Sequence, residues 1–478
     1  MYLCGVEKDM KEEKIDTRRE EFNALGEQPV GKLLMQYAIP AIVAMAASSI
    51  YNIIDGIFIG QGVGPEAIMG LALVNPVMSL TAAFGAMVGV GGSTLMSVRL
   101  GQKDYKTAQN ILDNVLFMNV VMGLTLGLVL QLFLKPILRY FGASDVTIGP
   151  AYDFMTVILC GNVVTHLYLG LNAMLRSTNR PRKAMTATIG TVCCNLVLAP
   201  TFIFLFKWGI RGAALSTVCS QFIMLCWQIH LFSDKSKMIH IHRGMPNIRL
   251  RIIRQALVVG LPQFLINLCA CMVAIFITRS LTHFGDMSAV GGDVAVGGYG
   301  ISNRVVLFIV MIVIGLNQGM QPIAGYNYGA QKYDRLLQVL KKSIIFATII
   351  TATGFVVGFV FATPLATLFA KDSPELIRQG ALSLRIMVST FPLVGVQIMS
   401  TAFFQSIGYA GKSIFLSLTR QLLFLIPMIL LLPHVMDDKV FGVLLSLPAA
   451  DVLAFTLAVS MQAIQVKKFR KILRERQA

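Results

Sequence analysis

Long segments without a charged residue dominate this sequence. For example, no Lys, Arg, Asp or Glu occurs in residues 67–98, 114–134, 184–206, 212–233, 255–278 and 343–370. A helix needs roughly 20 apolar residues to cross the hydrocarbon core of a bilayer. Backbone groups in lipid must be hydrogen-bonded within their own segment, so helices are the expected form. Only 14% of the residues are charged, against about 25% in soluble domains. The sequence therefore predicts a polytopic membrane protein.

Basic residues predict how the chain is oriented. We expect twelve spans, near residues 33–59, 66–98, 112–134, 150–174, 184–206, 211–232, 255–281, 295–324, 342–368, 377–403, 413–433 and 440–465. With both termini inside, the inner tails and loops hold 30 Lys and Arg residues and the outer loops hold 8. This asymmetry predicts that both termini are cytoplasmic. The net charge of +17 then faces anionic lipid headgroups, and a nucleic-acid partner is not expected.

The two halves of the chain resemble one another. Matching residues recur at offsets of 222, 228 and 229: Pro40 with Pro262, Gly101 with Gly329, and Ser177 with Ser406. The two prolines are expected to open spans 1 and 7. Since six spans return the chain to the same side, the repeat is parallel, about an axis along the membrane normal. The predicted fold is an all-α integral membrane protein of twelve transmembrane helices in two pseudo-symmetric six-helix bundles.

These boundaries predict five regions along the chain. They are a cytoplasmic N-terminal tail (1–31), an N-lobe with spans 1–6 (32–232), a basic cytoplasmic linker (233–254), a C-lobe with spans 7–12 (255–466) and a basic cytoplasmic tail (467–478).

Asp55 is one of two acidic residues deep inside predicted spans. A central carboxylate costs about 2.5–3.5 kcal/mol on insertion scales, so it needs a partner, a proton or a cavity. Ser48, Tyr51, Asn52 and Asp55 share one face of a helix. A carboxyl group in apolar surroundings favours its protonated form, and oxygen ligands suit hard cations such as Na+. The face therefore predicts a proton or cation site, with a permanently paired Asp55, or one near the outer interface, as the structural alternative.

Asp451 is the other intramembrane acid, in the C-half. Arg304, Arg385 and Arg420 lie in spans of the same half. Two roles are open for these residues: a structural ion-pair network, or the lining of a substrate cavity. Ser48, Asn52, His166 and Asn172 are weaker candidates for lining a substrate cavity, and Asn195 and Thr217 are further polar residues in spans. Such side chains often serve instead as hydrogen-bond partners between helices.

Several motifs of energy-coupled or catalytic proteins do not occur in the sequence. It contains no Walker A loop, no His-Glu-x-x-His and no Gly-x-Ser-x-Gly. The eight cysteines form no CxxC pair with downstream partners, so no structural metal is expected. We expect neither an enzyme nor a resident cofactor.

Short motifs occur at the ends of the predicted spans. They are Tyr-Asn-Ile-Ile-Asp-Gly-Ile-Phe-Ile-Gly (51–60), Arg-Leu-Gly-Gln-Lys-Asp-Tyr (99–105), Leu-Arg-Ser-Thr-Asn-Arg-Pro (175–181), Gly-Ile-Arg-Gly-Ala-Ala-Leu-Ser-Thr (209–217), Gly-Leu-Pro (260–262), Gln-Pro-Ile-Ala-Gly-Tyr-Asn-Tyr-Gly-Ala (321–330) and Arg-Gln-Leu-Leu-Phe-Leu-Ile-Pro (420–427). In the order and spacing of these motifs, the chain after residue 30 resembles the multidrug and toxic compound extrusion (MATE) family.

This resemblance implies a V-shaped pair of bundles and export of amphipathic or cationic compounds by alternating access, driven by H+ or Na+ entry. It implies that Asp55 is the coupling carboxylate, with Tyr51, Asn195 and Thr217 beside it. One departure stands out. The family's usual Asn-x-x-x-Asp-Pro in span 5 reads Asn195-Leu-Val-Leu-Ala199-Pro200. With a single carboxylate, the site has less charge to hold Na+, which favours proton coupling.

Two other functions remain open from the sequence. A flippase for lipid-linked saccharides would share this architecture and would use basic residues in its cavity to bind phosphate groups. A receptor or scaffold would act through the short tails and loops alone. For the exporter we expect small organic substrates, contact with membrane lipids, a monomeric state, and location in a bacterial inner membrane.

Overall fold

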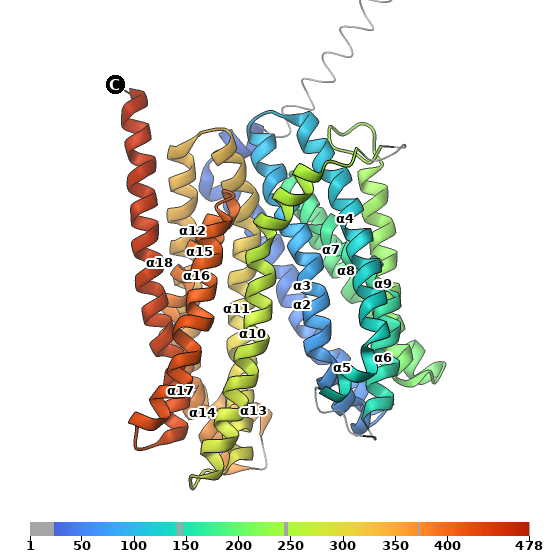
Figure 1. Ribbon diagram of the computed structural model, residues 1–478, viewed down its shortest axis with the longest axis vertical. Helices are drawn as coiled ribbons and strands as arrows, with labels where there is room; N and C mark the ends of the chain where they lie inside the picture. Colours follow the sequence, from blue (N-terminus) through green and yellow to red (C-terminus); the bar gives the residue numbers. More distant parts are fainter. Residues whose placement is uncertain (1–22, 141–144, 146, 243–246, 371–372, 478) are drawn as a thin grey trace, which may run out of the picture.

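The chain folds into a bundle of long helices (Figure 1). This computed structural model describes residues 23–140, 145, 147–242, 247–370 and 373–477, and these residues contain no strand. Ten helices are long and apolar enough to cross a membrane, and two bent pairs raise the number to twelve if each pair is one span. The predicted all-α membrane fold is confirmed.

Each half of the chain supplies one lobe. The N-lobe consists of α2 (Val30–Gly62), α3 (Pro65–Gly101), α4 (Tyr105–Leu132), α5 (Leu134–Tyr140), α6 (Ile148–Cys160), α7 (Asn162–Ser177), α8 (Pro181–Pro200), the π-helix η1 (Thr201–Leu205) and α9 (Gly209–Phe232). The C-lobe consists of α10 (Leu250–Asp286), α11 (Gly292–Gly329), α12 (Tyr333–Val360), α13 (Ala362–Phe369), α14 (Pro374–Val388), α15 (Phe391–Ser406), α16 (Ala410–Leu418), η2 (Thr419–Leu425), α17 (Ile426–Val435) and α18 (Lys439–Gln477).

Breaks in the helices repeat between the lobes. Span 4 is the pair α6 and α7, bent by 56°, and span 10 is the pair α14 and α15, bent by 52°. Phe133 separates α4 from α5, and Phe361, 228 residues later, separates α12 from α13. The long helix of the ninth span therefore ends at Val360. The expected continuation to residue 368 is wrong, because a separate short helix, α13, begins at Ala362.

The two prolines lie inside helices. Pro40 is within α2 and Pro262 within α10, so the expectation that they open their spans is wrong. Both helices begin about three turns earlier, at Val30 and Leu250. Transmembrane helices tolerate proline because neighbouring helices and local adjustments satisfy the backbone groups that it frees.

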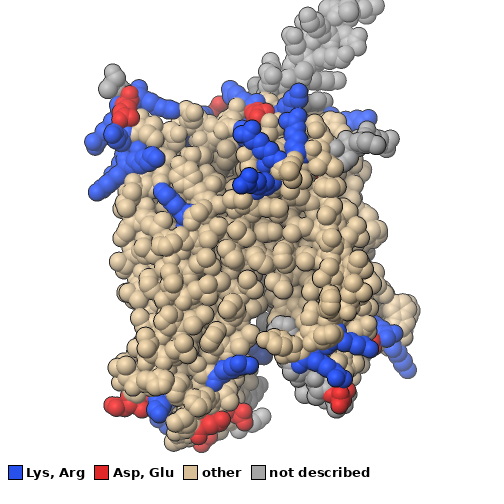
Figure 2. All heavy atoms as spheres, in the orientation of Figure 1, with Lys and Arg blue, Asp and Glu red and all other residues tan. Residues whose placement is uncertain are grey.

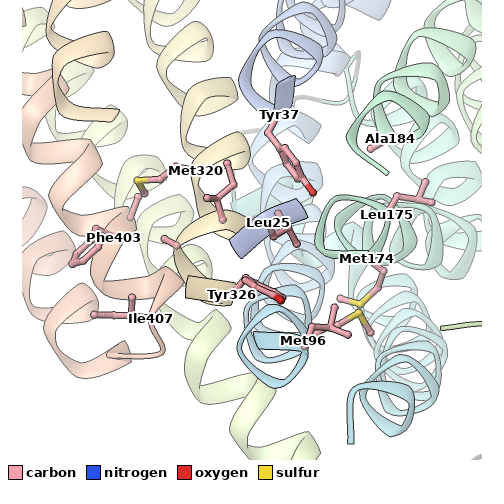
Figure 3. Packing of buried hydrophobic residues seen from close by; sticks show 14 of the residues in the cluster. Leu25, Tyr37, Met96, Met174, Leu175, Ala184, Met320, Tyr326, Phe403 and Ile407 are labelled. Atoms are coloured by element: carbon pink, nitrogen blue, oxygen red, sulfur yellow. The ribbon is translucent and has the colours of Figure 1, made fainter. Parts of the chain in front are cut away.

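The lobes share one buried core at the end of the molecule where α2 begins and α18 ends. Tyr37, Met96, Met320 and Phe403 belong to this cluster (Figure 3), and they come from α2, α3, α11 and α15. At the other end the buried clusters are separate, one in the N-lobe around Ile59 and two in the C-lobe. We call these the closed end and the open end. A gap separates the lobes at the open end (Figure 2).

Glycines allow the lobes to meet backbone to backbone at the closed end. A Cβ atom added to Gly91 would lie 1.9 Å from the carbonyl oxygen of Ala256, and one added to Gly260 would lie 1.9 Å from that of Met87. Both contacts join α3 to α10, and similar contacts join α11 to α2 at Gly315 and Gly319. We call these contacts the seam.

The segment before α2 crosses to the other lobe. Side chains of α11, of α12 and of the turn between them donate to its backbone carbonyls: Asn327 Nδ2 to Leu25 (3.1 Å), Lys332 Nζ to Gly26 (3.0 Å) and Arg335 Nη2 to Gln28 (2.6 Å). The start of the N-lobe is thereby held by the C-lobe at the closed end.

We expect Gly91→Ala to destabilise this conformation, because the new methyl group would overlap the Ala256 carbonyl. Overpacking of this kind costs roughly 1–3 kcal/mol. Gly300→Ala is the matched control, since no atom lies within 4 Å of a Cβ there, and alanine is the better helix former. Thermal unfolding of the purified protein should show a lower midpoint for Gly91→Ala only. Equal midpoints would contradict the described seam.

Candidate functional site

Three predicted site residues meet inside the N-lobe. Asn195 Nδ2 on α8 donates to Tyr51 Oη on α2 (2.8 Å) and to Thr217 Oγ1 on α9 (3.1 Å). The two hydroxyl oxygens lie 3.4 Å apart, and Asn195 is buried. Hydrogen bonds of one amide therefore join three helices at a single point, which we call the amide cluster.

Ser216 completes the amide cluster and was not predicted. Its Oγ atom lies 3.3 Å from Asn195 Oδ1, and its hydroxyl proton is shared with the carbonyl oxygen of Ala213 at 2.7 Å. Serine is common in membrane helices, and only its position beside Thr217 could have drawn attention to it. Both ends of the Asn195 amide therefore have a polar neighbour.

Asp55 lies one helical turn beyond Tyr51, toward the open end of α2. The residue is half-buried, and its Oδ1 atom is buried without a hydrogen-bond partner. None of the ion pairs between described residues includes Asp55. A buried carboxylate oxygen without a partner is costly as an anion, so binding of a proton or a cation would stabilise this group.

Ala199 provides no second charge near Asp55. It is buried on α8 and belongs to the apolar cluster around Ile59. Asn195 and Ala199 are one turn apart on the same helix face. The amide cluster is therefore followed by an apolar contact where the usual family pattern has an acid.

Other predicted residues of the N-lobe lie in different surroundings. Ser48 is half-buried and Asn52 is exposed on α2. His166 is buried between α7 and α3, with Nε2 3.0 Å from the carbonyl oxygen of Thr81. Asn172 Nδ2 donates to the carbonyl of Ala184 (3.1 Å) and so joins α7 to α8. The structure does not bring His166 or Asn172 into the amide cluster, and both make contacts between helices.

Asp451 is paired within the C-lobe. Arg420 donates from Nε and Nη2 to Asp451 Oδ1, each at 2.8 Å, and Thr390 Oγ1 lies 3.4 Å from Oδ2. Arg420 lies in η2, on the span formed by α16, η2 and α17. Asp451 is thus fixed between two other spans, whereas Asp55 is not paired in this way.

The remaining arginines of the C-lobe spans lie apart from Asp451. The guanidinium carbon of Arg304 is 5.8 Å from the ring centre of Phe369, and Arg385 Nε donates to the carbonyl of Phe359 (3.3 Å). Both residues are exposed. Among the residues that the structure describes, no group of three His, Cys, Asp or Glu side chains could hold a metal ion.

Comparison with known proteins links both lobes to one family. The family model described as MatE matches residues 40–201 and 264–431, more than half of the chain. The multidrug export protein MepA of Staphylococcus aureus (strain MSSA476) is 25% identical over 380 residues, covering 80% of this chain and 82% of its own. MepA of Staphylococcus haemolyticus (strain JCSC1435) is 25% identical over 433 residues, covering 91% and 93%.

Solved structures show the same fold. The outward-facing conformation of a multidrug resistance MATE family transporter of the MOP superfamily superposes with a TM-score of 0.87 at 23% identity, covering 94% of this chain and 98% of its own. A MATE structure in the bent conformation has the same TM-score and identity and covers 95% and 98%. The match to both lobes confirms the resemblance of the motifs. The chain therefore belongs to the MatE family, whose members are membrane transporters and not enzymes.

Proposed function

We propose that this protein is a secondary active exporter that releases amphipathic or cationic organic compounds in exchange for entering H+, with Asp55 as the coupling carboxylate. The observation that carries the proposal is the Oδ1 atom of Asp55, which is buried and has no hydrogen-bond partner. Asp55 lies one helical turn from Tyr51 of the amide cluster. A carboxylate that must gain and lose a cation cannot be fixed by a permanent salt bridge, and Asp55 has none among the described residues.

The shape of the molecule supports alternating access. The lobes are packed together at the closed end and separate at the open end. Substrate bound between them is accessible from one side only. We assign the closed end to the cytoplasm, because most of the Lys and Arg residues of the tails and loops lie on that side. The relatives named MepA are bacterial multidrug export proteins, which supports a plasma-membrane location and multidrug efflux here.

The ion is proposed from the number of charges at the site. With Ala199 at the position of a second acid, the proposed site has Asp55 as its carboxylate, and one proton neutralises one carboxylate completely. Na+ would require several oxygen ligands, which Asp55, Tyr51, Asn195 and Thr217 could supply, so it is the alternative that experiment has to separate. No resident cofactor is required in either case, and the proposed working unit is a monomer.

The rival function is a flippase for lipid-linked saccharides. It requires cationic side chains free to bind phosphate in the central cavity. Arg420 forms an ion pair with Asp451, so its guanidinium group is not free to bind a phosphate group. Accumulation of saccharide-lipid in a deletion strain, without drug sensitivity, would favour the flippase instead.

We expect Asp55→Asn to reduce drug resistance to the level of an exporter-deficient host that carries no transporter, because asparagine cannot exchange a proton. Asp437→Asn, at an exposed position, is the matched control and should retain resistance. Membrane abundance of both variants is measured in parallel. Resistance that persists in a normally expressed Asp55→Asn variant would exclude Asp55 as the coupling residue while leaving the fold unaffected.

Proteoliposomes can separate the two ions. Substrate accumulation should follow an imposed pH gradient and should be absent with an Na+ gradient alone, because one carboxylate needs only one proton for neutrality. Collapse of each gradient with a selective ionophore is the control. Accumulation driven by Na+ alone would overturn the assignment of the proton.

The amide cluster should act as one unit. Asn195→Ala removes its centre and Tyr51→Phe removes one acceptor, so the double variant should be little slower than Asn195→Ala alone. The coupling energy of contacting residues is about 0.5–3 kcal/mol. Initial transport rates of the four proteins measure it. The pair Tyr51→Phe and Thr390→Val, in different lobes, should be additive, and additivity in both pairs would argue against a joint role.

A further inference from the structure

A cavity lies at the closed end, outside the candidate coupling site. It has a volume of about 630 Å³ and lies where the end of α3 meets the start of α10 and the turn before α16. Arg99 comes from the N-lobe, and Arg251 and Arg254 come from the C-lobe. The cavity is therefore built by both lobes next to the seam, since Ala256, which contacts Gly91, follows Arg254 by two residues.

The charge of this cavity is positive throughout. Three arginines and no acidic residue line it. Arg99 is engaged by Gln102 (3.0 Å) and lies 3.9 Å from Asp104, whereas Arg251 and Arg254 are exposed and have no ion pair with a described residue. Lys and Arg side chains gather over the upper ends of α3 and α10 (Figure 2). A cationic substrate would be repelled here, and an anion would be attracted.

The remaining wall of the cavity is apolar. Val98, Val258 and Ile407 contribute to the lining, and Val258 is 47% exposed on a helix that crosses the membrane. Arg254 precedes Val258 by one helical turn, about 6 Å along the axis. A suitable ligand thus has an anionic group beside the arginines and a hydrocarbon chain that reaches a helical turn deeper.

We propose that this cavity binds an acidic phospholipid of the leaflet at the closed end. Its phosphate would lie among Arg99, Arg251 and Arg254, because guanidinium groups bind phosphate through paired hydrogen bonds. Its acyl chains would lie along Val258 and the adjoining lipid. Basic pockets between helices at a membrane surface commonly bind anionic headgroups. A free phosphate ion would leave the apolar wall unused.

Binding at this place favours one conformation. The phosphate contacts both lobes only while α3 and α10 are packed together, so a lipid bound here stabilises the closed end relative to a state in which that end has opened. By linkage, opening the closed end weakens lipid binding by the same factor. Acidic lipid would thereby regulate the conformational equilibrium without contacting the substrate or Asp55.

The test uses full-length protein in detergent, titrated with phosphatidylglycerol or with phosphatidylcholine of the same chain length. Native mass spectrometry counts bound lipid, and the thermal midpoint reports stabilisation. We expect phosphatidylglycerol to bind and to raise the midpoint more than phosphatidylcholine does. Arg251→Gln with Arg254→Gln should weaken that binding about thirty-fold, since each basic residue near an anionic lipid contributes about 1 kcal/mol, or about a factor of five.

The matched control replaces Arg470 and Arg474, two exposed arginines one turn apart on α18, with glutamine and should leave phosphatidylglycerol binding unchanged. Equal loss in both double variants, or equal binding of the two lipids, would overturn the proposal. Competition by inorganic phosphate at the concentration at which the lipid binds would show an anion site and overturn the assignment to lipid. If the double variant fails to fold, Arg254→Gln alone provides the same comparison. None of these readouts requires transport, so they stand apart from the proposed function.

Discussion

The close approach of α3 to α10 and of α2 to α11 determines the shape of this protein. In lipid, helices gain little from burying apolar surface against one another, so association depends on close packing and on polar contacts. Gly91 and Gly260 let main-chain atoms touch where any side chain would overlap a carbonyl. In each of these helices, the contacts lie in the half that belongs to the closed end. The other halves of the same helices are free to diverge, and the gap at the open end follows.

The candidate coupling site is kept apart from this contact. The amide cluster joins α2, α8 and α9, all within the N-lobe. A change of charge at Asp55 therefore acts first on the packing of α2 within its own lobe. Since α2 also packs against Gly315 and Gly319 of α11, one helix carries both the carboxylate and a contact with the other lobe. The C-lobe has no equivalent arrangement, because its intramembrane acid, Asp451, is already neutralised by Arg420.

Much of the fold could be predicted because lipid restricts the possible structures. Charge-free stretches mark spans, and matching residues 228 apart mark the repeat that Phe133 and Phe361 show in three dimensions. Helical periodicity placed Tyr51 and Asp55 on one face. The choice of Arg420 among three arginines as the partner of Asp451 was not predictable, since it depends on how separate spans pack. Ser216 was missed for the same reason. The breaks near residues 161 and 389 were also missed, although Gly161 and Pro392 lie at them.

The segment of residues 25–28 has a mechanical consequence for the transporter. Its carbonyl groups are bound by Asn327, Lys332 and Arg335, although its chain continues directly into α2 of the opposite lobe. It is thus a short tether between the two lobes at the closed end. Any movement that separates the lobes on that side must either release these carbonyls to water or draw the segment out with α11 and α12. The strength of these main-chain contacts, made by residues outside the candidate coupling site, therefore contributes to the work of opening the closed end.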